Sequence, residues 1–402
     1  MKKHLLLIIL VILSFHLRAA DDKTYYLDSR SGEMVKFIED QVILNLNVLS
    51  KHTNNYLYET KDKTDSTASY EISPSLKAQY HNDYQMLQLG LWVKSRKISN
   101  FSEDDTVDSS GLAKYHFKFK DNQSVVFSGA FFNNHFSRGT GLSQGQGDEL
   151  KERDHRKSYF LNLAHKIGNE DSNANLTSMF GIRDTKYQNR PEATAGLNLS
   201  ASFIFLDFQY SLSEKTYLTS KLSFEDVKHD IGEQQDRKIS SALVGIKWHK
   251  TDFTHFDLSL GAFNVSFEDG ALDSKQDFKW DAKFRWAPLE QLEFSALSLR
   301  VIDENRQIEN SYLVKDKYGF TATYRYTDTI EFFSRNTYNL LEYYFEDGNE
   351  SEESLISDLT IFYKFKHNMS LSFSYIYEDL KSVDGLDNYK RNSVTLGVSF
   401  VI

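Results

Sequence analysis

The sequence predicts an all-β fold, a transmembrane antiparallel up-and-down β-barrel of about 18 strands, and three observations support it. Apolar and polar residues alternate at period two through stretches of roughly ten to fifteen residues, as in strands with one apolar face. Short polar turns alternate along the chain with longer charged or glycine-rich connections. The chain also begins with a segment typical of exported proteins.

The N-terminal segment "MKKHLLLIILVILSFHLRAADD" has the three parts of an export signal. Lys2 and Lys3 precede an apolar run over 5–13, and the small residues Ala19 and Ala20 follow it. We therefore expect residues 1–20 to be a removed signal peptide, 21–37 a short periplasmic segment and 38–402 the barrel. An uncleaved anchor helix is the alternative reading of the same run.

Composition excludes several classes of protein. The chain has no cysteine, which removes disulfides and thiolate metal sites. Its net charge of −10 argues against nucleic-acid binding, and its 30 Phe and 23 Tyr argue against disorder. The mean hydropathy is −0.51, and beyond the first twenty residues no apolar run is long enough for a membrane-spanning helix.

The alternation is clearest in the second half of the chain. In "DFKWDAKFRWAP" (277–288) the apolar row includes Trp280 and Phe284, and charged residues fill the row between them. The closing stretch "NSVTLGVSFVI" places Val394, Leu396, Val398, Phe400 and Ile402 on one face. An exposed apolar edge would promote aggregation. We therefore expect the last strand to pair with the first and its apolar row to face lipid.

One stretch breaks the pattern. In "LNLSASFIFLDFQYSL" (197–212) the alternation changes phase between Phe203 and Phe208. A β-bulge would explain the change, and so would a position near the membrane interface, where both faces tolerate aromatic residues.

The connections give the strand count. Short turns are expected at 81–83, 120–123, 168–173, 213–215, 249–254, 287–291, 326–329 and 366–368. Longer connections lie between them, among them 59–67, 99–111, 137–153, 346–354 and 382–387. Short turns at one end and long loops at the other are the layout of an outer-membrane barrel. A soluble β-sandwich is the alternative, but it would not combine an export signal, an aromatic outer row and a terminal apolar strand.

The charges on the polar faces are the candidate functional residues. As the lining of a pore we expect Lys221, Glu225, Asp257, Lys279, Asp281, Lys283, Arg285, Arg325, Lys364, Lys366 and Glu378. Two explanations stay open: the mixed solvated charge of any water-filled barrel, or opposed rows that give a passing glycan weak contacts.

No other motif predicts chemistry. The histidines are scattered without metal-ligand spacing, and neither a GxSxG motif nor another catalytic spacing occurs. We therefore expect no catalytic residue, no metal site and no cofactor, although a catalytic group at a barrel rim is an alternative. "SRGTGLSQGQG" (137–147) lacks the ending of a phosphate-binding loop. It is typical of a mobile surface loop, whereas a functional version would fold inward and constrict the channel.

Several stretches resemble the β-barrel porin 2 type of outer-membrane barrel, which is commonly encoded with exopolysaccharide, capsule or exosortase systems. They are "TNNYLYETKDKTDSTASYEISPSL", "RKISSALVGIKWHKTDFTHFDLSLGA", "FKWDAKFRWAPLEQLEFSALSLR" and "DNYKRNSVTLGVSF". The resemblance extends over nearly the whole mature chain.

The resemblance implies a passive outer-membrane conduit for exopolysaccharide or capsular polysaccharide, without chemistry of its own. The implied partners are outer-membrane lipid, the barrel assembly machinery, a periplasmic polysaccharide export component and the polysaccharide cargo, with no nucleic acid. The alternatives are a general or solute-specific diffusion porin and a structural or surface-binding barrel.

Overall fold

The computed structural model describes residues 41–59, 65–169, 172–231, 236–251, 253–268, 274–303, 312–345, 348–382 and 388–401. The expected signal peptide (1–20) and periplasmic segment (21–37) lie outside these residues. None of the helices in the described ranges is long and apolar enough to cross a membrane.

The described residues form eighteen strands. The alternation in the sequence decides which side chains of each strand face the interior of the barrel. The first nine are β1 (Gln41–Thr53), β2 (Thr67–His81), β3 (Gln85–Ile98), β4 (Thr106–Lys120), β5 (Gln123–His135), β6 (His155–Ile167), β7 (Ala174–Tyr187), β8 (Leu199–Ser213) and β9 (Thr216–His229). The others are β10 (Arg237–Thr251), β11 (Thr254–Phe267), β12 (Lys275–Leu289), β13 (Leu292–Asp303), β14 (Tyr312–Arg325), β15 (Ile330–Phe345), β16 (Gly348–Lys366), β17 (Met369–Ser382) and β18 (Tyr389–Val401).

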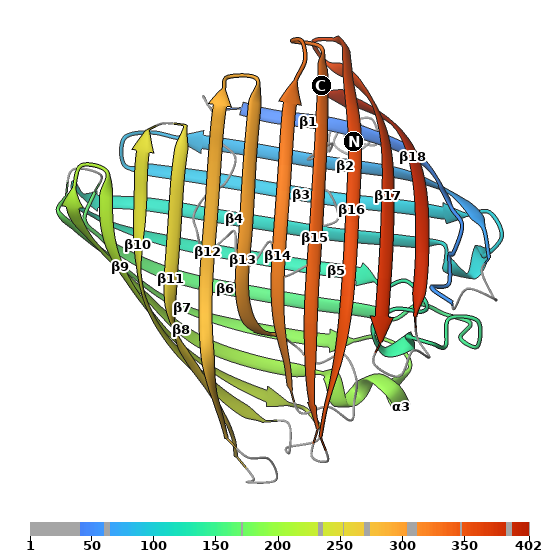
Figure 1. The fold of residues 1–402 in the computed structure, drawn as a ribbon, viewed down its shortest axis with the longest axis horizontal. Coiled ribbons are helices and arrows are strands. Elements are labelled where there is room, and N and C mark those ends of the chain that lie inside the picture. Colours follow the sequence, from blue (N-terminus) through green and yellow to red (C-terminus); the bar gives the residue numbers. More distant parts are fainter. Residues whose placement is uncertain are drawn as a thin grey trace, which may run out of the picture.

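The strands pair in chain order as antiparallel neighbours, and β18 pairs with β1, which closes the sheet into a barrel. Val48 lies opposite Val398 and Leu46 opposite Phe400, so the apolar row of the last strand continues into the first. In Figure 1 the strands of the near wall cross those of the far wall, as expected for strands tilted against the barrel axis. The predicted barrel with 18 strands is confirmed.

All eight short turns fall between strands, at the end where β1 starts and β18 ends. We call this end the turn end and the opposite one the loop end. Two of the longer connections are shorter than predicted. The connection expected over 346–354 is mostly strand, because β16 starts at Gly348, and β4 starts at Thr106 within the expected 99–111. Charged and serine residues in both stretches alternate and pair in the sheet, so their polarity alone was misleading.

Strand β8 contains no bulge between Phe203 and Phe208. It pairs with β7 and β9 without a register shift from Leu199 to Ser211. Phe203 lies on the interior face and is buried, whereas Phe208 lies on the outer face and is exposed. The change of phase therefore reflects apolar residues on the interior face of β8, and the bulge interpretation was wrong.

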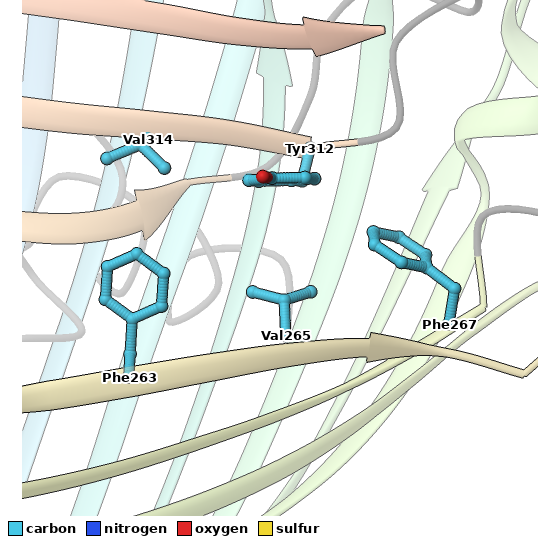
Figure 2. Packing of buried hydrophobic residues seen from close by; sticks show 5 residues of the cluster. All are labelled: Phe263, Val265, Phe267, Tyr312 and Val314. Carbon is cyan, nitrogen blue, oxygen red and sulfur yellow. The ribbon is translucent and has the colours of Figure 1, made fainter. Parts of the chain in front are cut away.

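The wall overlaps itself between β12 and β13. These strands pair only from Asp281 opposite Leu299 to the turn, so 275–280 and 300–303 separate toward the loop end. Figure 2 shows Phe263, Val265 and Phe267 of β11 pointing toward Tyr312 and Val314 of β14, although β12 and β13 lie between these strands in the sheet. The loop-end part of β14 is therefore displaced inward, and its outer face packs on the interior face of β11.

Polar contacts connect the same overlap. Arg300 of β13 bonds Asp316 of β14 at 2.6 and 2.7 Å and also reaches Asp277 of β12 at 3.3 Å. The guanidinium lies over the ring of Trp280, whose Nε1 donates to Ser298 Oγ at 2.9 Å. Trp280, expected in the lipid-facing row, therefore contacts the neighbouring strand at this seam.

Candidate functional site

Alternation divides the strand residues into an outer and an interior face. The outer face carries large exposed apolar side chains such as Val244, Leu396 and Leu359. Residues directly opposite each other on paired strands share a face, so the register assigns the remaining positions. Ten of the eleven predicted lining residues lie on the interior face. The exception is Lys366, which follows a register shift at the end of β16 and lies opposite Met369 of the outer face. That they line a conducting pore stays a prediction.

The predicted residues do not form one group. Lys221 Nζ on β9 lies 3.3 Å from Asp281 Oδ2 on β12, and Asp257 lies opposite Lys283. Lys279 Nζ donates to Ser241 Oγ at 3.1 Å. These contacts hold the middle of the β9–β12 wall together on its interior face.

The other predicted residues lie elsewhere. Arg285 pairs with Glu293 at 2.8 Å and Arg325 with Glu331 at 3.6 Å, both near the turn end, where Lys364 and Lys366 also lie. Glu378 lies toward the loop end and pairs with Arg391 at 3.2 Å. These positions are separated because they lie at different heights along the strands and on different sides of the wall.

Basic residues outnumber acidic ones on the interior face. The basic residues are Lys51, Lys77, Lys94, Arg96, Lys114, Lys118, Arg156, Lys166, Arg183, Lys221, Arg237, Lys247, Lys275, Lys279, Lys283, Arg285, Lys315, Lys317, Arg325, Arg335, Lys364 and Arg391. The acidic residues are Glu71, Asp108, Asp207, Glu225, Asp257, Asp277, Asp281, Glu293, Glu331, Glu350, Glu352, Asp358 and Glu378.

The basic residues of the first half were missed at the sequence level. Lys114, Lys118 and His116 alternate with the apolar residues of "LAKYHFKF" on β4, and Lys166 lies two strands away on β6. The same period-two reading could have found them. Lys118, Ser124 and Lys166 occupy one line across β4, β5 and β6, which puts Lys118 and Lys166 about 10 Å apart at Cα.

The connection 136–154 between β5 and β6, here the mouth segment, folds inward. Gln144 Nε2 donates to Glu352 Oε2 at 2.9 Å, and Glu352 is a buried interior residue of β16. Strands β4, β3, β2, β1, β18 and β17 separate β5 from β16 along the shorter way around the wall. The segment therefore reaches across the loop end of the barrel. The segment folds inward, as in the alternative to a mobile surface loop. That it constricts a conducting channel stays a prediction.

A buried arginine anchors the mouth segment. Arg138 Nε lies 3.0 Å from both carboxylate oxygens of Asp104, and its Nη1 donates to the Leu150 carbonyl at 2.5 Å. Asp104 is fully buried in the short helix η2 (Ser102–Asp104) between β3 and β4. Arg153 Nη2 donates to Tyr56 Oη at 3.3 Å. Such a set is stable only while each buried charge keeps its partner.

Two glycines allow the close approach of the mouth segment to the β1–β2 connection. A Cβ on Gly139, whose φ is +77°, would lie 1.7 Å from the Leu57 carbonyl oxygen, and one on Gly147 would lie 2.4 Å from it. Tyr56 also stacks on Phe101, with ring centroids 4.8 Å apart. Burial raises the pKa of the Tyr56 phenol, which therefore stays neutral at physiological pH. The glycines of the mouth segment therefore allow it to pack closely against the β1–β2 connection.

The third connection in the mouth is between β7 and β8, and it includes α3 (Pro191–Thr194), visible in Figure 1. Arg190 pairs with Asp154 at the end of the mouth segment, and Asn189 Nδ2 donates to the Arg153 carbonyl at 2.8 Å. Burial raises the pKa of Asp154, and the Arg190 guanidinium opposes this rise. Three connections therefore pack into one unit in the loop-end mouth.

The interior offers no metal site among the described residues, where no group of three or more His, Asp or Glu side chains is arranged to hold an ion. What the arrangement provides is a closed wall, an interior face rich in charged and hydroxyl groups, and a narrowed mouth. These are the parts of a channel.

Comparison with known proteins supports this description. A family model described as "Putative beta-barrel porin 2" matches residues 208–401. A search of curated proteins found no match. Among solved structures, the FrpB iron transporter of Neisseria meningitidis in its apoprotein form aligns with a TM-score of 0.50 and 9% identity, covering 91% of this chain and 82% of its own.

The siderophore receptor PirA of Acinetobacter baumannii aligns similarly, with a TM-score of 0.50 and 8% identity over 91% of this chain and 81% of its own. At such low identity these two structures show a shared barrel fold. The closed antiparallel wall and the family match over the second half of the chain together identify this protein as a porin-like outer-membrane β-barrel.

Proposed function

We propose that this barrel is the outer-membrane passage for an exopolysaccharide or capsular polysaccharide and does no chemistry on its cargo. The observation that carries the proposal is the interior: a closed wall of 18 strands whose inward side chains are mainly charged, hydroxyl and amide groups. A barrel of this strand number is wide enough for an aqueous channel.

The cargo in this proposal is based on the resemblance of the sequence to barrels encoded with polysaccharide export systems. An extended glycan needs a continuous hydrated path with contacts weak enough to release it. The interior ion pairs fit this need, because charges that already have partners, such as Lys221 with Asp281, hold a passing chain weakly.

A diffusion porin is the second candidate, and the mouth segment favours it. The contact from Gln144 to Glu352 narrows the loop-end opening, which suits small solutes better than a polymer unless the segment moves. A surface-binding barrel is the third candidate, and the packing of the three mouth connections against each other leaves less of them free for such contacts.

The test is a deletion strain in which secreted polysaccharide per cell is measured, with a plasmid copy of the gene as control. We expect secretion to fall and the plasmid to restore it. Secretion at the wild-type level, in a strain with no related barrel, would contradict the conduit and leave the diffusion porin.

A further inference from the structure

Only part of the basic charge on the interior face is matched by acids. Toward the loop end Arg96 pairs with Glu71 at 3.2 Å and Arg391 with Glu378 at 3.2 Å. Near the turn end Arg285 pairs with Glu293 at 2.8 Å. Further interior lysines form no ion pair with any described residue, although Asp257 lies between Lys247 and Lys283 in the register. These lysines are Lys114, Lys166, Lys247, Lys283 and Lys364.

Some of these cations lie close together. Lys118 and Lys166 lie on one line across β4, β5 and β6, about 10 Å apart at Cα. Lys114 and His116 share the interior face of β4 with Lys118. We name Lys114, His116, Lys118 and Lys166 the basic arc.

This arrangement is opposite in sign to the whole chain, whose net charge is −10. A solvated interior with no function toward charge would be expected to follow the composition of the chain. A channel wall of low dielectric constant concentrates the field of like charges into the water between them. An excess of cations there attracts anions and repels cations.

From this distribution we infer that the cargo is anionic: a glycan that carries carboxylate groups, drawn into the barrel at its turn end by the basic arc and the lysines facing it. The inference rests on the proposed function, which it makes more specific. Paired charges further along would hold the same chain more weakly, so that it is not trapped.

The probe is polygalacturonate, a glycan with one carboxylate per sugar, immobilised on a resin; the matched neutral resin carries amylose. The detergent-solubilised barrel is loaded at low salt and eluted with a KCl gradient. We expect retention on polygalacturonate and none on amylose. The K114Q/K166Q variant should elute at a KCl concentration lower by roughly a third or more, because screened charge contacts dominate.

The control variant is K157Q/K381Q, which removes the same charge from the outer face near the loop end and should elute as wild type. Ion selectivity in planar bilayers gives a second readout. The reversal potential in a KCl gradient should report a preference for chloride of roughly twofold or more, reduced in K114Q/K166Q.

Equal behaviour on the two resins, or equal loss of retention in both double variants, would overturn the inference. This result is separable from a failure of the conduit. If the barrel retains the anionic glycan but its deletion leaves polymer secretion intact, the protein is an anion-selective porin. If deletion abolishes secretion but the barrel does not retain the anionic glycan, the cargo is a neutral glycan.

Discussion

At a single strand position, the parity of the residue decides whether its side chain meets lipid or the interior. Val244 and Lys247 on β10 are three residues apart and lie on opposite faces. The apolar valine is on the outer face and the charged lysine is on the interior face. The same rule placed ten of the eleven predicted charged residues on the interior face, and it failed for Lys366, where the register shifts. It says nothing about which of them meet, because partners such as Lys221 and Asp281 come from strands far apart in the chain.

Val244→Arg tests this rule on the outer face. Val244 is 66% exposed in the middle of β10, so the arginine would lie in lipid and should lower the free energy of unfolding by about 2–4 kcal/mol. Urea unfolding in lipid vesicles measures the change. Lys283→Ser on the interior face is the control and should leave unfolding nearly unchanged. Equal losses would show that the two faces are assigned wrongly.

Arg138→Gln tests the anchor of the mouth segment. The change removes the closer of the two arginines that pair with the fully buried Asp104 carboxylate, and breaking a buried ion pair typically costs about 3–5 kcal/mol. We expect the segment to leave the mouth while the barrel stays folded, seen as faster proteinase K cleavage within 136–154 and larger single-channel conductance. Gln146→Ala, at an exposed position of the same segment, is the control. Unchanged cleavage and conductance would mean that Arg138 does not hold the segment.

At the scale of elements, two features depart from a simple barrel: the overlap at β12 and β13, and the inward mouth segment. In the overlap, Arg300 and Tyr312 lie at outer-face positions by alternation and register. The displaced strands nevertheless bring Tyr312 against β11 and Arg300 against β12. Tyr312 stacks on Tyr344 with ring centroids 4.6 Å apart, and Lys275 of β12 lies over the Tyr344 ring. The overlap is therefore packed like a small core inside the wall.

Phe263→Ala tests the packing of the overlap. Phe263 is 1% exposed, so removing its ring should cost about 3–5 kcal/mol of unfolding free energy. Phe224→Ala removes the same ring from an exposed outer position on β9, where lipid fills the space, and should cost less. Urea unfolding in vesicles compares the two variants. A smaller loss for Phe263→Ala than for Phe224→Ala would show that the overlap is not packed as described.

At the scale of the whole molecule, pairing of β1 with β18 closes the sheet, so none of the eighteen described strands is an edge strand. The resulting barrel should resist denaturation by detergent at room temperature and should migrate differently on gels before and after boiling. We expect this heat-modifiable migration and recovery in the outer-membrane fraction. Recovery of the mature protein as a soluble periplasmic monomer without detergent would contradict the membrane barrel.

The sequence by itself determined the wall. Period-two alternation and the eight short turns were sufficient for strand number, order and the outward row of residues such as Leu396 and Val398, because these depend on neighbours along the chain. The expected sites were determined only as positions on a face. The predicted lining residues begin at Lys221, so Lys114 and Lys166 were missed, although the alternation around them was visible in the sequence.

Only the tertiary structure decided the mouth, the overlap and the distribution of interior charge. Arg138 meets Asp104, Gln144 meets Glu352, and Phe263 meets Val314 through contacts between segments distant in sequence. Such contacts follow no periodic pattern in the sequence and cannot be recognised from local composition. A glycine-rich polar segment is therefore predicted to be exposed until its partners are known. Alternation fixes the side of the wall on which a residue lies, and closure of the barrel fixes what it meets there.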